Sequence, residues 1–138
     1  MQKQFLNLLS LAVIALSLSL LASCEKDAGK LPNIAFKTGT NYTSADKTVA
    51  KGTTITIGIN ASKAEDKDVL KSFDASRSVN GAAGVSFFNE TTTSANQDNY
   101  SKDLDITVGS TAGTEKYTFT VVNRDGLTNS VSLTLTVQ

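Results

Sequence analysis

The feature that most constrains the fold of this chain is an alternation of apolar and polar residues with a period of two. It is clearest in three runs, Thr53 to Ala61, Thr114 to Asn123 and Asn129 to Val137. Successive side chains of a β-strand point to opposite faces, so the pattern is typical of strands with one buried and one solvated face. We therefore expect an all-β protein. The residues expected to point inward are Ile55, Ile57, Ile59 and Ala61, then Tyr117, Phe119 and Val121, then Val131, Leu133, Leu135 and Val137.

Turn signals divide the chain into short strands. The Asp-Gly pair within Asn123 to Gly126 favours a tight turn, so the last two runs should form an antiparallel hairpin. Ser62 to Glu65 matches a capping box and predicts one helical turn. Weaker strands are expected at Ile34 to Lys37, Thr48 to Ala50, Leu70 to Val79, Val85 to Asn89 and Leu104 to Gly109. About seven short strands with this spacing favour a sandwich of two sheets.

The C-terminal third resembles a known kind of domain. Gly113 to Gly126, followed by the alternating Ser130 to Val137, is similar to the closing hairpin of bacterial immunoglobulin-like extracellular domains. This resemblance implies an antiparallel Ig-like β-sandwich of about seven strands. In that family a tyrosine that opens the penultimate strand often bonds to upstream backbone. Tyr117 occupies that position, so the resemblance implies a structural role for it.

The first 24 residues carry a targeting signal. Lys3 precedes the apolar run Phe5 to Leu21, and Leu21-Ala22-Ser23-Cys24 matches the bacterial lipobox. This resemblance implies a signal peptide over residues 1–23, with Cys24 acylated by palmitate-type chains and left as the new N-terminus after cleavage. Two or more acyl chains hold a protein stably on a membrane without spanning it. A short transmembrane helix and an ordinary secretory peptide are the alternatives, and the position of the sole cysteine favours the lipoprotein.

The expected organisation follows from that signal. A lipidated tether covers residues 24–31, and the Ig-like domain covers residues 32–138. Glu25 after the lipidated cysteine gives no clear retention signal, so the outer membrane is the expected location, on its periplasmic or its cell-surface side.

Composition argues against catalysis. The chain contains no histidine, so mechanisms that need a histidine base or histidine metal ligands are excluded. Its 13 basic and 13 acidic side chains balance, which leaves no net attraction to nucleic acid. Asp66, Asp68, Asp103 and Asp105 could offer oxygen ligands to calcium or an acid–base pair, but scattered carboxylates usually belong to a solvated surface. We expect no enzyme activity, no cofactor and no metal.

Aromatic side chains are the remaining candidates for binding. Tyr42, Phe88 and Tyr100 are expected to be exposed, because Phe87 in phase with Val85 should point inward and Phe88 outward. The first hypothesis is a non-catalytic, lipid-anchored surface Ig-like module that acts in protein interaction or as an accessory subunit. The alternative is a small glycan-binding lipoprotein of a nutrient-uptake system, in which rings pack against sugars. A pilus subunit completed by a donor strand is disfavoured by the full set of strands.

Overall fold

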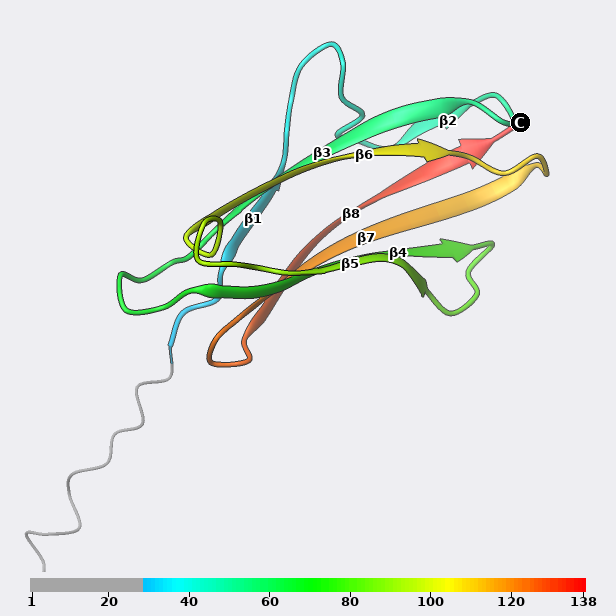
Figure 1. The fold of residues 1–138 in the computed structure, drawn as a ribbon. Helices are drawn as coiled ribbons and strands as arrows, with labels where there is room; N and C mark the ends of the chain where they lie inside the picture. The colour runs from blue at the N-terminus through cyan, green and yellow to red at the C-terminus, as the bar shows by residue number, and fades with distance from the viewer. Residues whose placement is uncertain (1–28) are drawn as a thin grey trace, which may run out of the picture.

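The computed structural model describes residues 29–138 as eight strands in two sheets that pack face to face (Figure 1). One sheet has the order β1-β3-β6 and the other the order β2-β8-β7-β4-β5. The strands are β1 Asn33–Phe36, β2 Lys47–Val49, β3 Thr54–Ser62, β4 Leu70–Val79, β5 Val85–Thr91, β6 Asn99–Thr107, β7 Gly113–Asn123 and β8 Thr128–Val137. The predicted all-β, Ig-like sandwich is confirmed. The expected signal peptide and Cys24 lie outside the described residues.

Pairing within the sheets is antiparallel except between β2 and β8, which run parallel. The predicted hairpin of β7 and β8 is present and extends from the pair Gly113 and Val137 to the turn. There the amide of Gly126 donates to the carbonyl of Asn123 at 3.1 Å, and Gly126 has a φ of 82°. That region favours glycine, which explains the strength of the Asp-Gly signal.

The core lies between the two sheets and contains the residues that the alternation predicted. All eleven predicted inward residues are buried except Val131, which packs against the core while partly buried. Phe73 of β4 lies at the centre of an aromatic cluster. Its ring centroid is 5.0 Å from that of Tyr100 and 6.4 Å from that of Phe119, and Phe119 meets Phe36 edge-on at 5.9 Å. Aromatic contacts therefore join strands of both sheets.

The helical turn predicted at Ser62 to Glu65 is wrong. Ser62 is the last residue of β3 and pairs with Asn33 on one side and Asn99 on the other. Its hydroxyl accepts a hydrogen bond from the Asn33 side chain at 3.3 Å, so it does not cap a helix. Strand pairing on both sides keeps the backbone extended here. Across residues 29–138 there is no helix long and apolar enough to cross a membrane.

The folded domain begins earlier than the predicted boundary at Pro32. The carbonyl of Lys30 accepts a hydrogen bond from the Asn123 side chain at 3.1 Å, and the carbonyl of Pro32 accepts one from the Asn129 side chain at 2.9 Å. These bonds tie the entering chain to the hairpin of β7 and β8, at the end of the sandwich opposite the C-terminus (Figure 1). Lys30 and Pro32 therefore pack with the folded domain.

Candidate functional site

A β-bulge in β5 changes the direction of two neighbouring aromatic side chains. Ala75 of β4 pairs with Phe88, but the next residue, Ser76, pairs with Ser86, so Phe87 is an extra residue without a partner in β4. A bulge breaks the period of two and re-aims a side chain. Phe87 and Phe88 therefore do not alternate across the sheet as predicted.

Phe88 is the better buried of the two rings. Its centroid lies 6.1 Å from that of the buried Phe73, and the residue packs against the core. Phe87 meets the buried ring of Tyr117 edge-on at 6.0 Å, yet it remains 45% exposed. The prediction that Phe88 is an exposed contact residue is wrong, and Phe87 is the exposed ring.

Tyr100 is also buried, contrary to the prediction, with 2% of its surface exposed. Its hydroxyl donates to Glu90 at 2.8 Å, across the seam between β6 and β5. Lys102 lies 3.0 Å from the same carboxylate and 4.6 Å above the ring of Phe88. Burial, and then the contact with Glu90, raise the pKa of Tyr100, while the hydrogen bonds from Tyr100 and Lys102 lower the pKa of Glu90. These groups close the seam, and they do not present a free ring.

Tyr42 lies on the outer face of the three-stranded sheet, away from that seam. Its hydroxyl donates to Asp103 at 3.0 Å, and Lys37 donates to the same carboxylate at 2.6 Å. These bonds, that from Lys37 first, lower the pKa of Asp103. The ring covers Gly58 so closely that a Cβ there would lie 2.7 Å from Tyr42 Cε1. The three rings predicted as a binding set therefore share no common surface.

Tyr117 is fully buried, and its hydroxyl bonds to a carboxylate where the family resemblance implied a bond to backbone. Its hydroxyl donates to Glu115 Oε2, two residues upstream on the same face of β7. Burial, and then the contact with Glu115, raise the pKa of Tyr117. Glu115 Oε1 accepts from the amide of Gly109 at 2.9 Å and from Arg77 Nη2 at 2.8 Å. The tyrosine therefore forms part of a buried polar cluster.

The charge that this cluster presents to solvent is positive. The Glu115 side chain is 4% exposed and the Arg77 side chain 35%. Arg77 Nε is buried and has no hydrogen-bond partner among residues 29–138. Neither residue was among the predicted site residues, although the sequence contains a signal for Glu115. Glu115 is in phase with the inward-pointing Tyr117, and a carboxylate at such a position needs a buried partner.

β5 is the least protected of the four edge strands in the described chain. β1 and β2 have only four and three residues. β6 carries three charged side chains, whereas Glu90 is the single charged side chain among the seven residues of β5. Short length and charged side chains are the usual protection of an edge against pairing with another chain. β5 is longer than β1 and β2 and carries one charged side chain, so its bulge is its main protection.

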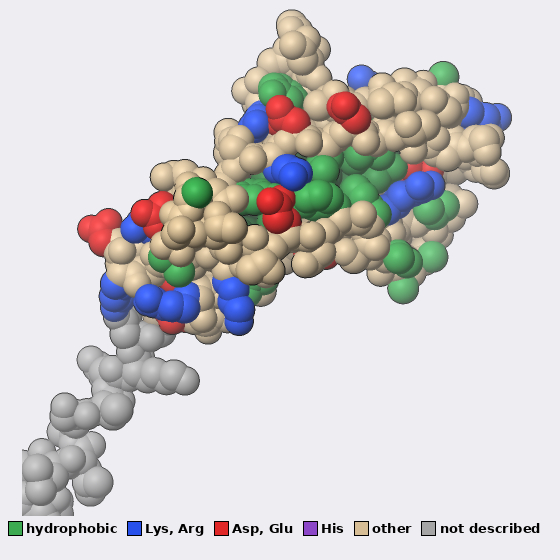
Figure 2. All heavy atoms as spheres, viewed as in Figure 1, with side chains coloured by type: hydrophobic (Ala, Val, Ile, Leu, Met, Phe, Trp, Pro, Cys, Tyr) green, Lys and Arg blue, Asp and Glu red, His purple; other side chains and the backbone are tan. Residues whose placement is uncertain are grey.

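Exposed apolar side chains gather beside this edge. Val85 is 70% exposed and Val79 is 40% exposed, and together with Phe87 they form what we call the β5 patch. It arises because a sheet of five strands is wider than the opposing sheet of three, so β5 is left partly uncovered. A cavity of about 220 Å³ adjoins the patch, and its lining residues are Arg77, Phe87, Asp105, Ile106, Thr107 and Tyr117. Figure 2 shows hydrophobic side chains sunk between the two layers.

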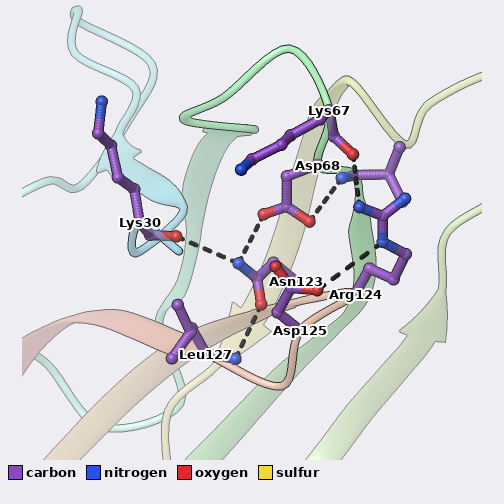
Figure 3. A network of polar contacts seen from close by, with 8 residues as sticks. Lys30, Lys67, Asp68, Asn123, Arg124, Asp125 and Leu127 are labelled. Atoms are coloured by element: carbon purple, nitrogen blue, oxygen red, sulfur yellow. Dashed lines mark hydrogen bonds and ion pairs between the residues drawn. The ribbon is translucent and has the colours of Figure 1, made fainter. Parts of the chain in front are cut away.

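The acidic residues considered as calcium ligands do not converge. Among residues 29–138 no group of three or more acidic, cysteine or histidine side chains is placed to hold a metal ion. Asp68 is buried and accepts from the Asn123 side chain at 2.6 Å and from the amide of Val69 at 2.8 Å. Asn123 in turn bonds to Lys30 and Leu127 (Figure 3). This network is structural, because it joins three loops at the end of the domain where the chain enters.

Comparison with known proteins identifies the fold alone. No family model and no curated protein matches the sequence. A superoxide reductase (neelaredoxin) from Ignicoccus hospitalis is similar, with a TM-score of 0.52 at 7% identity over 79% of this chain and 81% of that one. The CARDB domain of a Pyrococcus furiosus protein matches with a TM-score of 0.47 at 10% identity, over 79% of this chain and 99% of that one. At 7% identity the likeness to the reductase concerns the arrangement of strands and carries no activity to this chain.

Proposed function

We propose that this protein is a non-catalytic, lipid-anchored Ig-like module that binds another protein through the β5 patch, as an interaction partner or an accessory subunit. The observation that carries the proposal is the exposure of Val85 and Phe87 beside an unprotected edge strand. Contiguous exposed apolar side chains next to polar neighbours are typical of protein contact surfaces. Aromatic residues are enriched in such contacts.

The expected anchor would leave this patch accessible. The described chain begins at Gly29, five residues after Cys24, and five residues span at most about 18 Å. An anchor at Cys24 would therefore hold the end of the domain that carries the β7–β8 turn (Figure 1). Leu70 of β4 pairs with Asn123 beside that turn, whereas Val79 pairs with Glu115 at the opposite end of β7. The β5 patch then lies at the end of the sandwich that faces away from the membrane.

Lipidation is tested by replacing Cys24 with alanine and growing cells with a labelled fatty acid. The unsubstituted chain should incorporate the label and appear in the membrane fraction, because its thiol is the acylation site. The variant should remain unlabelled and unprocessed. Label on the Cys24→Ala variant would exclude this cysteine as the anchor.

Binding through the β5 patch is tested by formaldehyde cross-linking in whole cells. The double variant Val85→Ser with Phe87→Ser should lose the adduct that the unsubstituted protein forms with its partner. Leu31→Ser is the matched control, because Leu31 is 55% exposed but lies outside the patch. The control should keep the adduct, and thermal melts should show that all the variants are folded. An adduct that survives in the double variant would show that the partner does not bind through the β5 patch.

The glycan-binding alternative has less support. It needs several rings on one surface, whereas Tyr100 is buried in the seam and the ring of Tyr42 covers Gly58. A glycan array probed with the full chain distinguishes the two functions. Sugar binding that depends on Tyr42 and is unaffected by the β5 double variant would replace the protein-interaction proposal.

A further inference from the structure

We propose that the partner segment at the β5 patch is an extended stretch of another polypeptide, which adds to the free edge of β5 as a further strand and directs a carboxylate to Arg77. This inference rests on the proposed function and specifies its partner. The segment would alternate apolar and polar residues, because successive side chains of the added strand point to opposite faces of the sheet.

The length and exposure of β5 suit such a segment. One edge of β5 pairs with β4, and its other edge has no neighbouring strand among residues 29–138. Its seven residues extend for about 23 Å at roughly 3.3 Å per residue. The bulge turns Phe87 toward the cavity, where it contacts Tyr117 but remains half-exposed. Inward side chains of the added strand would lie against Phe87 and Val85 as cross-strand neighbours.

The charge at the patch favours a carboxylate on that strand. Both oxygens of Glu115 are already used, by Tyr117, by the amide of Gly109 and by Arg77. Arg77 keeps a third of its side chain exposed, and its buried Nε still needs an acceptor. Arginine binds carboxylates more strongly than neutral acceptors. The Cα partner of Arg77 in β5 is Val85, so Arg77 lies beside the patch.

A carboxylate directed to Arg77 fits a strand added at β5 better than one added at β6. Arg77 belongs to β4, the strand that pairs with β5, and its Cα partner there is Val85. The β6 edge also carries three charged side chains, against one in β5. The Asp105 carboxylate of β6 accepts from Thr56 at 2.6 Å on the outer face of the three-stranded sheet, so it does not oppose a carboxylate at the cavity.

A second copy of this chain fits the edge less well. A two-fold pair of β5 strands in one continuous sheet has to be antiparallel, since a two-fold axis parallel to the strands would bring like backbone groups together. The N-terminal ends of the two domains would then lie at opposite ends of the dimer. If each copy carries a lipid at Cys24, both lipids could not enter the same membrane. A segment of a different polypeptide has no such restriction.

The proposal is tested by selecting a phage-displayed library of random 12-residue peptides on the full chain in detergent. The enriched peptides should alternate apolar and polar residues and contain an aspartate or glutamate. Their affinity should fall at least about tenfold on the Phe87→Ser variant and remain unchanged on the Leu31→Ser control. Changing the peptide carboxylate to its amide should weaken binding to the unsubstituted chain several-fold but should have no effect on the Arg77→Gln variant. This double comparison separates the ion pair from any loss of stability in that variant.

Other results would overturn the inference. Absence of enrichment, or peptides that bind the Phe87→Ser variant equally well, would exclude an added strand. Sedimentation that shows a dimer of the unsubstituted chain, abolished by Phe87→Ser, would make a second copy the occupant. If no peptide binds but the cellular adduct still depends on the β5 patch, the partner presents a folded surface, and the proposed function stands without the added strand. If no peptide binds and the cellular adduct does not depend on the β5 patch, both proposals are contradicted.

Discussion

Replacing Phe88 by alanine should destabilise the protein more than replacing Phe87, although the two side chains are the same and adjacent. Truncating a fully buried phenylalanine costs about 3–5 kcal/mol. Phe88 is partly buried, packs on Phe73 and lies beneath the Lys102 ammonium, so we expect a loss of about 2–3 kcal/mol. Phe87 is 45% exposed, and its truncation should cost about 1 kcal/mol. Urea unfolding measures both values, and the slope with denaturant should remain unchanged.

The comparison between the two variants tests the bulge directly. Simple alternation places Phe87 inside and Phe88 outside, and it predicts the opposite order of stabilities. A larger loss for Phe87→Ala than for Phe88→Ala would therefore refute the register shift between Ala75 and Ser76. A smaller loss of stability for Phe87→Ala would also make Phe87 variants suitable for binding experiments, because their effects on binding could be separated from unfolding.

Further predictions concern the buried polar groups. Asn123→Ala should lower the free energy of unfolding by about 3 kcal/mol, because it removes a donor from the buried Asp68 carboxylate. A value from urea unfolding within about 0.5 kcal/mol of the unsubstituted chain would contradict the network. Tyr117→Phe should cost about 1–2 kcal/mol in the same assay, because the Glu115 carboxylate loses a hydrogen bond, and a neutral effect would argue against that contact. The pKa of Tyr100 is raised in the folded state, so its stabilising contribution is complete below the ordinary value of 10.0 and declines as the pH rises above it. Urea midpoints between about pH 9 and 11 should fall more steeply for the unsubstituted chain than for Tyr100→Phe, and parallel curves would contradict the assigned shift.

The strands could be predicted where local pattern and tertiary environment agree. β3, β7 and β8 each have one buried face and one face toward solvent, so their alternation indicates both the strand and its orientation. The helical turn was predicted because Ser62 and Glu65 suit a cap locally. Pairing of Ser62 with both neighbouring strands overrides that preference, and such pairing depends on segments distant in sequence.

The candidate site could be predicted only in part. A bulge is a property of the register between two strands, so nothing in the sequence around Phe87 and Phe88 indicates it. The exposure of Val85 depends on the unequal widths of the two sheets, which local alternation does not contain. By contrast, the inward phase of Glu115 is present in the sequence and would have indicated a buried ion pair with a basic residue.

The central claim is that the β5 patch is the surface through which this domain meets another protein. The most direct test replaces Phe87 with a photoactivatable benzophenone side chain in cells. The control carries the same group at Tyr42, on the outer face of the other sheet. If the β5 patch is the contact surface, we expect an adduct with a defined polypeptide from position 87 and none from position 42. Equal adducts from both positions, or an adduct from position 42 alone, would contradict it.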